Sequence, residues 1–141
     1  MQPSQGEIAE SIARRAHEGQ LDKAGAPYIE HPAHVAATVE GDEAKAVAWL
    51  HDVVEDTAYT FSDLEAEGIN GTVIDALRLL THSKGVPYLD YVRTIKQNPL
   101  ATKVKLADLA HNSDLSRLAE VTETDRARVE KYRQAIQLLS E

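Results

Sequence analysis

The residues best suited to chemistry in this sequence lie in the octet LHDVVEDT, residues 50–57. It contains one imidazole, that of His51, and three carboxylates, those of Asp52, Glu55 and Asp56. If the segment is helical, the i+3 and i+4 offsets place these four side chains on one contiguous patch. The Ala, Val and Leu residues around them indicate a buried helix, where such a cluster needs a cation to neutralise it. The alternative is an exposed acidic face with a satisfied histidine.

Two other segments supply matching ligand types. His31 follows a turn in PYIEHPAHVA, and Asp108 interrupts the apolar run of VKLADLAHN. Because Asp is a poor residue for a helix interior, a buried Asp there needs a strong partner. Two imidazoles, from His31 and His51, with two carboxylates, from Asp52 and Asp108, suit Mn2+, Zn2+ or Fe2+ better than Mg2+ or Ca2+. A cation held by this set would lower the pKa of water toward neutrality, so the set predicts metal-assisted hydrolysis.

The composition narrows the class of protein. A chain of 141 residues is the usual size of one domain, so we expect residues 1–141 to form a single unit. With no Cys, any metal must be held by His, Asp and Glu. The net charge of -8 makes nucleic acids and membranes poor partners, although a bound cation can reverse the field inside one cleft. No apolar run approaches the roughly 18 residues that cross a bilayer, and the N-terminal segment MQPSQGEIAE lacks the basic-then-apolar pattern of a secretory signal, so we expect a cytoplasmic protein.

Helices must position these residues. Every long segment has the helical period and none alternates convincingly like a strand, so we expect an all-α fold, a bundle of about seven or eight helices. Helix starts are indicated where Ser or Thr precedes an acid by three residues: Ser4, Thr60 and Thr122. His31 is expected at a helix entrance, and Asp42 is expected to cap a helix over residues 43–56. The helix after Thr122 can cover the core or pair with another subunit; we expect the former and leave the oligomeric state open.

The order and wording of these segments resemble a known family. His31, His51-Asp52 and Asp108 resemble the H…HD…D signature of the HD superfamily of metal-dependent phosphohydrolases. The segments PYIEHP, LHDVVEDT and KLADLAHN resemble the hydrolase domain of the bifunctional RelA/SpoT-type alarmone enzymes and of their small stand-alone relatives. The resemblance runs from about Ala13 to Leu118. It implies an HD-domain helical bundle and, as the first choice of function, a (p)ppGpp 3′-pyrophosphohydrolase that acts on this small nucleotide.

The resemblance also implies roles for individual residues. It gives one metal ion, typically Mn2+, four ligands: His31, His51, Asp52 and Asp108. Glu55 and Asp56 match the acidic pair that orients or activates the attacking water. Three residues match positions near the nucleotide: Lys23, Lys105 and Asn112. Lys23 and Lys105 can equally be ordinary solvated bases.

Two acids stand where the family is usually basic. Asp22 precedes Lys23 in place of a basic pair, and Asp114 follows Asn112 where the family has Met-Arg-Thr. Near a strongly anionic substrate, an acid in place of Arg weakens binding through charge and lost bidentate contacts. Two alternatives therefore stay open. The substrate can be another nucleotide, such as a monophosphate or NADPH, or the domain can bind metal or nucleotide without turnover, against which the intact acidic pair argues.

The remaining histidines and tyrosines are assigned weaker roles. His34, one turn after His31, can hydrogen-bond toward the metal site or lie at the surface. His111 lies about 100° around the helix from Asn112, so we expect a structural role. Three tyrosines can line a base-binding pocket or pack in the core: Tyr28, Tyr88 and Tyr91.

Overall fold

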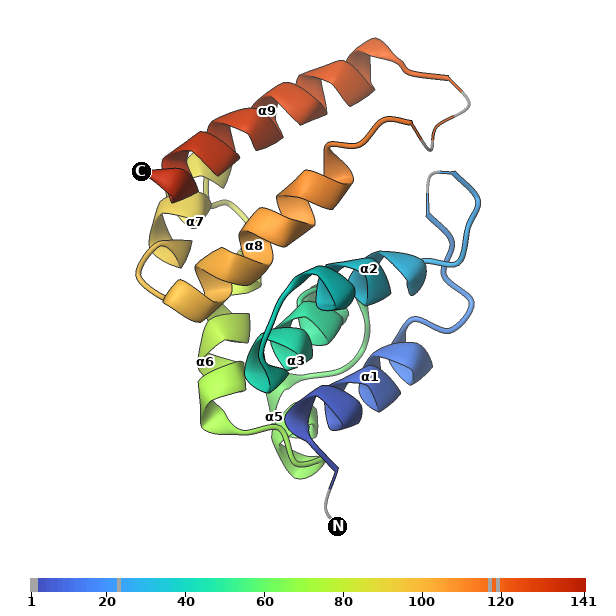
Figure 1. Cartoon of the computed structure of the whole chain (residues 1–141), viewed down its shortest axis with the longest axis vertical. Helices are drawn as coiled ribbons and strands as arrows, with labels where there is room; N and C mark the ends of the chain where they lie inside the picture. The colour runs from blue at the N-terminus through green and yellow to red at the C-terminus, as the bar shows by residue number, and fades with distance from the viewer. Residues whose placement is uncertain (1–2, 23, 117, 119) are drawn as a thin grey trace.

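The computed structural model describes residues 3–22, 24–116, 118 and 120–141. Its helices are, in chain order, α1 (Gln5–Ala16), α2 (Glu30–Thr38), α3 (Asp42–Leu50), α4 (Val53–Asp56), α5 (Phe61–Ala66), α6 (Gly71–Leu80), α7 (Tyr88–Ile95), α8 (Pro99–Asn112) and α9 (Glu123–Ser140) (Figure 1). The described residues form no strand beyond one isolated bridge between Leu21 and Pro27. The predicted all-α bundle is confirmed, and its number of helices agrees if the single turn α4 is counted with α3.

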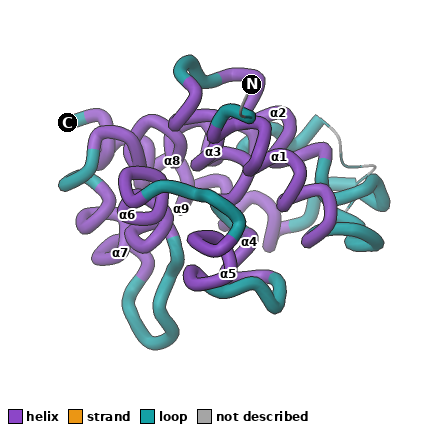
Figure 2. Tube along the Cα trace, turned by 90° about the horizontal axis from the view of Figure 1, so that it is seen from below, coloured by secondary structure: helices purple, strands orange, loops and turns teal. Residues whose placement is uncertain are grey.

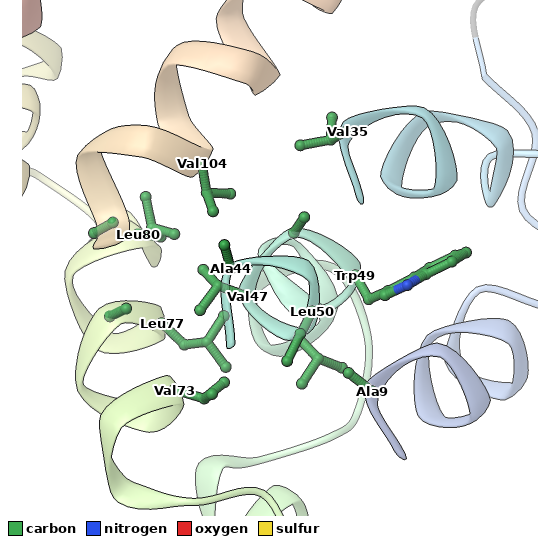
Figure 3. Packing of buried hydrophobic residues seen from close by; sticks show 14 of the residues in the cluster. Ala9, Val35, Ala44, Val47, Trp49, Leu50, Val73, Leu77, Leu80 and Val104 are labelled. Atoms are coloured by element: carbon green, nitrogen blue, oxygen red, sulfur yellow. The ribbon is translucent and has the colours of Figure 1, made fainter. Parts of the chain in front are cut away.

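α3 lies at the centre of the bundle. It contacts α1, α2, α6 and α8, and six of its residues are buried. Figure 3 shows Val35 of α2, Leu77 of α6 and Val104 of α8 around this helix. The C-terminal half of α3, residues 46–50, is apolar and buried on every side, as expected for a helix segment that other elements surround. Residues at its C-terminal end are therefore surrounded by several other elements.

The predicted helix starts at Ser4, Thr60 and Thr122 are confirmed, and each is a capping box. In each, the Ser or Thr hydroxyl accepts from the backbone N–H three residues later, and the acid there accepts from the N-cap N–H. The N-cap residues are Ser4, Thr60 and Thr122. Asn98 caps α8 in a similar way, with Pro99 in the first turn, where its missing N–H costs no hydrogen bond.

The prediction that Asp42 caps the helix that follows it is wrong. The N-cap of α3 is Gly41, and the Asp42 carboxylate accepts from the backbone N–H groups of Gln5 and Gly6, each at 2.9 Å. These are free donors of the first turn of α1. A Cβ on Gly6 would lie 2.9 Å from Asp42 Oδ1, so a larger residue there would displace this carboxylate oxygen. Asp42 thus ties the start of α1 to the start of α3.

The single helix predicted over residues 43–56 is interrupted at His51 and Asp52, between α3 and α4. Asp52 has φ -110° and ψ -2°, away from ordinary helical values. The His51 side chain donates from Nδ1 to the carbonyl oxygen of Ala48 at 2.6 Å. This bond occupies a carbonyl that the helical ladder would otherwise use, and such side-chain bonds compete with helix continuation.

α9 runs beside α7 and α8 (Figure 1). Its Ala135 and Leu139 are buried, so this helix covers one side of the core as expected. In the view from below, loops join the short helices, among them the turn α4 and the helix α5 that follows it in the chain (Figure 2). Among the described residues, no helix combines the length and apolar character needed to cross a membrane.

Candidate metal centre

Three buried side chains from different elements meet beside the end of α3. They are His31 of α2, His51 just after α3 and Asp108 of α8, with exposed fractions of 4%, 5% and 4%. Their possible ligand atoms lie within 4.8 Å of one another. Asp108 Oδ1 is 2.8 Å from His31 Nε2 and 3.2 Å from His51 Nε2. Both imidazoles therefore direct the same nitrogen at one carboxylate.

Asp52 joins this group from the break between α3 and α4. Its Oδ2 lies 3.1 Å from His51 Nε2, so that nitrogen faces the carboxylates of both Asp52 and Asp108. The hydroxyl of Tyr28 donates to the same Asp52 oxygen. Burial lowers the pKa of His51, but the charges of Asp52 and Asp108 raise it by more than burial lowers it. This pKa therefore lies well above its ordinary value. The structure thus brings the four predicted ligands together: His31, His51, Asp52 and Asp108.

The chemistry of this donor set fits a divalent cation. The Ala48 carbonyl can only accept, so the His51 bond to it puts a proton on Nδ1. In a neutral ring, Nε2 then carries the lone pair on the side of Asp52 and Asp108. Metal-binding histidines typically have such a partner on the second nitrogen. Two imidazoles with two carboxylates are a suitable set for a transition metal.

Lys105 lies against the ligand Asp108. Its Nζ is 3.0 Å from Asp108 Oδ2, and only 13% of its side chain is exposed. Burial lowers the pKa of Lys105, but Asp108 is the main group that raises it, and the net shift of this pKa is upward. Burial likewise raises the pKa of Asp108, while Lys105 and then His51 bring it well below its ordinary value. The amine of Lys105 is thus bound to Asp108. Its contact with a substrate stays a prediction.

The predicted acidic pair remains beside Asp52 despite the break in the helix. Carboxylate oxygens of Asp52, Glu55 and Asp56 lie within 4.8 Å of one another. Glu55 Oε1 accepts from the backbone N–H of His82 at 2.7 Å, which restricts this otherwise exposed side chain. Burial, and next the charges of Asp52 and Glu55, raise the pKa of Asp56 to about 6. A carboxylate with that pKa can act as a general base near neutral pH.

A cavity of about 330 Å³ adjoins these residues. Tyr28 and Asn112 line it, and each also contacts a ligand: the Tyr28 hydroxyl contacts Asp52, and Asn112 Nδ2 lies 3.0 Å from Asp108 Oδ1. The cavity therefore lies next to the metal centre. Of the predicted substrate-binding residues, Asn112 lines this wall, Lys105 is not among its lining residues, and Lys23 lies outside the described residues.

The two unexpected acids, Asp22 and Asp114, both line the cavity. Asp22 Oδ1 accepts from the backbone N–H of Ala24 at 2.8 Å, and Asp114 Oδ1 accepts from that of Ser116 at 2.9 Å. Each carboxylate thus closes a turn with the residue two positions on, a common use of Asp in loops. The two acids both shape the loops and add negative charge to the cavity wall.

Arg128 is a cavity residue that sequence reasoning missed. It comes from α9, and its guanidinium pairs with the buried carboxylate of Asp125 three residues earlier. In sequence, a base on a charged amphipathic helix resembles a solvated surface residue. The local signal was Asp125, which was predicted to begin this helix and which belongs to the capping box at Thr122.

The other histidines and tyrosines divide between site and core. His111 Nδ1 lies 2.6 Å from His31 Nδ1, and exposed His34 stacks on His111 with ring centroids 4.0 Å apart. His111, for which we expected a structural role, therefore contacts a predicted metal ligand, whereas His34 lies at the surface and contacts His111. Tyr91 is buried and donates its hydroxyl to the Leu80 carbonyl, so it packs in the core.

Comparison with known proteins gives curated relatives that are named as (p)ppGpp hydrolases or as GTP pyrophosphokinases. No family model matches the chain. It is 36% identical over 115 residues to a guanosine-3′,5′-bis(diphosphate) 3′-pyrophosphohydrolase of Haemophilus influenzae, which covers 72% of this chain and 17% of the relative. It is also 36% identical over 115 residues to the bifunctional (p)ppGpp synthase/hydrolase SpoT of Escherichia coli K12, covering 72% of this chain and 16% of that protein. The chain therefore spans only a small part of the length of these curated relatives.

A solved structure matches nearly the whole chain. It is described as a metazoan ortholog of SpoT that hydrolyzes ppGpp and plays a role in starvation responses. The match has a TM-score of 0.75 at 25% sequence identity, and it covers 99% of this chain and 88% of the other. Sequence and fold thus both relate the chain to SpoT-type enzymes. In sequence over 72% of its length, and in fold, the chain is similar to the SpoT-type (p)ppGpp hydrolases, as its H…HD…D signature indicated.

Proposed function

We propose that residues 1–141 act as one metal-dependent phosphohydrolase domain that removes the 3′-pyrophosphate from (p)ppGpp. The observation that carries this proposal is the convergence of His31, His51 and Asp108, together with Asp52, beside a cavity of about 330 Å³. The curated relatives named for this reaction support the choice of substrate. We keep the cytoplasm as the proposed location of the protein.

For the metal we propose Mn2+, with Zn2+ or Fe2+ as alternatives, because the donor set mixes nitrogen and oxygen. When bound, a divalent cation supplies a Lewis acid and lowers the pKa of water. Lys105 and Tyr28 each contact one carboxylate of the set, Asp108 and Asp52 respectively, and so restrict its orientation. His51 is oriented through the Ala48 carbonyl.

For the reaction we propose that Glu55 orients the attacking water molecule and that Asp56 accepts its proton. Glu55 is held by the N–H of His82, so its second oxygen can orient a water molecule. Asp56, with its pKa raised to about 6, can accept the proton that this water loses when it attacks phosphorus. On the substrate side, Asn112 can donate to the nucleotide, and Arg128 can offer a guanidinium to a phosphate.

A second candidate is the hydrolysis of a less anionic nucleotide, such as NADPH or a monophosphate. The observation that favours it is the position of Asp22 and Asp114 on the cavity wall. Two negative charges there oppose a substrate with two pyrophosphate groups more than one with fewer charges.

The test is a substrate panel with the full chain, first stripped by a chelator and then loaded with Mn2+. The panel contains ppGpp, nucleoside mono- and triphosphates and NADPH, and we expect metal-dependent release of pyrophosphate from ppGpp. Cleavage of NADPH or a monophosphate with ppGpp intact supports the second candidate. Metal retention with no cleavage of any substrate supports a binding module without turnover.

A variant tests the acidic pair within the same assay. Glu55→Gln should retain the metal but slow turnover by about 10² to 10⁴-fold, because it keeps the shape and loses the charge that orients water. Glu65→Gln is the matched control, since Glu65 is an exposed residue of α5 away from the cavity lining. Normal turnover by Glu55→Gln removes Glu55 from the mechanism.

The acids on the cavity wall allow a test of substrate charge. Asp22→Asn and Asp114→Asn keep the oxygen that accepts from the turn N–H and remove the negative charge. Together they should lower KM for ppGpp with little change in kcat, since neither residue belongs to the ligand set. An unchanged KM means that these charges do not restrict the choice of nucleotide.

A further inference from the structure

The imidazole of His31 is held at both of its nitrogens by one helix. Its Nε2 lies 2.8 Å from Asp108 Oδ1, and its Nδ1 lies 2.6 Å from His111 Nδ1. Asp108 and His111 are three residues apart on α8, so they lie on the same side of that helix. α8 therefore supplies both a carboxylate and an imidazole to the His31 ring.

The partner of His31 differs in kind from that of His51. The Ala48 carbonyl can only accept, so it determines which nitrogen of His51 carries the proton. An imidazole such as that of His111 can either donate or accept, and the direction of the bond decides what His31 Nε2 offers. The ring planes of His31 and His111 are 8° apart, which aligns an N–H of one with the in-plane lone pair of the other.

His34 supports this arrangement from outside. Its ring stacks on that of His111 with centroids 4.0 Å apart and planes 16° apart. His34 is exposed, His111 is half-buried and His31 is buried, so the three rings lead from the surface to the metal centre. Because His34 packs on the face of His111, it restricts rotation of the ring out of the plane it shares with His31.

We propose that His111 is a positioning residue for the ligand His31, with His34 as its support. In this arrangement His111 Nδ1 accepts the Nδ1–H of His31, which leaves the lone pair of His31 Nε2 for a divalent cation. The inference rests on the proposed metal centre and deepens it. Loss of such partners of a ligand typically weakens metal affinity by about 10- to 100-fold.

The first test compares the affinity for Zn2+ alone, measured by competition with a chromogenic chelator at one pH. His111→Phe keeps a ring to stack on His34 but removes the acceptor, and should weaken Zn2+ binding by about 10- to 100-fold. His111→Asn presents an amide oxygen near the position of Nδ1, and should bind within a few-fold of the original chain. If both variants bind like the original chain, or both lose affinity equally, His111 does not act as the acceptor.

His82→Phe is the matched control in this series. The His82 ring also stacks on an aromatic ring, that of Tyr91 at 4.4 Å, and its Nε2 contacts the Val86 carbonyl rather than a ligand. We therefore expect its Zn2+ affinity to equal that of the original chain. A loss as large as that of His111→Phe would overturn the proposal, because any ring substitution would then have the same effect.

A second test needs no substitution. In the Zn2+-loaded chain labelled with ¹⁵N-histidine, NMR should find His31 protonated at Nδ1 and coupled through the hydrogen bond to His111 Nδ1. A proton on Nε2, or no such coupling, overturns the inference. Failure of the original chain to bind Zn2+ refutes the metal centre itself, whereas Zn2+ binding without this coupling refutes only the role of His111.

Discussion

Lys105→Met separates the charge of the buried lysine from its packing. The substitution keeps an unbranched apolar side chain and removes the ammonium, which lies 3.0 Å from Asp108 Oδ2. Both side chains are largely inaccessible, 13% exposed for Lys105 and 6% for Asp108. The variant therefore leaves a buried carboxylate without its strongest cationic partner, while His31, His51 and Asn112 still contact its other oxygen.

The magnitude follows from this geometry. Two unit charges 3.0 Å apart attract by roughly 5.5 kcal/mol at an effective dielectric constant of about 20. Removing one partner of a buried pair costs about 3–5 kcal/mol in practice. Because the imidazoles of His31 and His51 still face Asp108, we expect the lower end, about 3 kcal/mol, in the metal-free protein. With a divalent cation bound at Asp108, that positive charge replaces the ammonium, and the loss should be clearly smaller.

The assay is urea denaturation of both chains at one pH, once with a chelator and once with saturating Mn2+. Lys103→Met is the matched control, because Lys103 is an exposed lysine of the same helix, and its effect should stay within about 0.5 kcal/mol. A loss below about 1 kcal/mol in chelator would refute the reasoning about the buried pair. An equal loss with and without Mn2+ would show that the cation does not bind beside Asp108.

Two further predictions concern carboxylates whose effects on stability have opposite pH dependence. The backbone N–H of Gly6 is the main cause that lowers the pKa of Asp42, so this carboxylate stabilises the fold above its unfolded pKa and loses that effect as the pH falls. Asp42→Ala should lower the free energy of unfolding by about 1 kcal/mol at neutral pH, as the loss of a helix cap does. This loss should disappear once the carboxyl is protonated at low pH, and a loss that stays constant with pH would contradict the assigned role. The pKa of Asp56 is raised to about 6, so its ionised form destabilises the metal-free fold, and the effect is absent below the unfolded pKa. Asp56→Asn should therefore raise the urea midpoint in chelator at about pH 7.5 but not at about pH 4, whereas a gain confined to acid pH would contradict the assigned shift.

Features that depend on neighbours in the sequence were predictable. The capping boxes at Ser4, Thr60 and Thr122 need only a hydroxyl and an acid three residues apart, so their hydrogen bonds close within one turn. The helical period of the apolar residues likewise depends only on near neighbours, and it predicted an all-α bundle in which the helix over residues 43–56 is buried. The types and order of His31, His51-Asp52 and Asp108 also sufficed to predict a metal centre, since few other arrangements satisfy such side chains in an apolar core.

Other expectations failed where a side chain formed bonds that the helical pattern does not include. The residues around Asp42 indicate an N-cap, but the first-turn N–H groups of Gln5 and Gly6 take its carboxylate instead. Helical spacing predicts one helix through His51, yet the break places His51 Nε2 between the carboxylates of Asp52 and Asp108. The N–H groups of Gln5 and Gly6 and the carboxylate of Asp108 lie far along the chain from the residues they contact, so no pattern of neighbouring residues reveals these partners.

By itself, the sequence determined which residues could bind a metal and which segments would be helical. Tertiary structure alone decided what surrounds them, because His31 lies 77 residues from Asp108 and 80 residues from His111 along the chain. His111 and Asn112 lie on different sides of α8. Because α2 packs against α8, the side that carries His111 faces His31. In the same way, the packing of α9 on α8 brings Arg128 to the cavity wall. Contacts at such separations depend on how the helices pack, and helical periodicity does not record that packing.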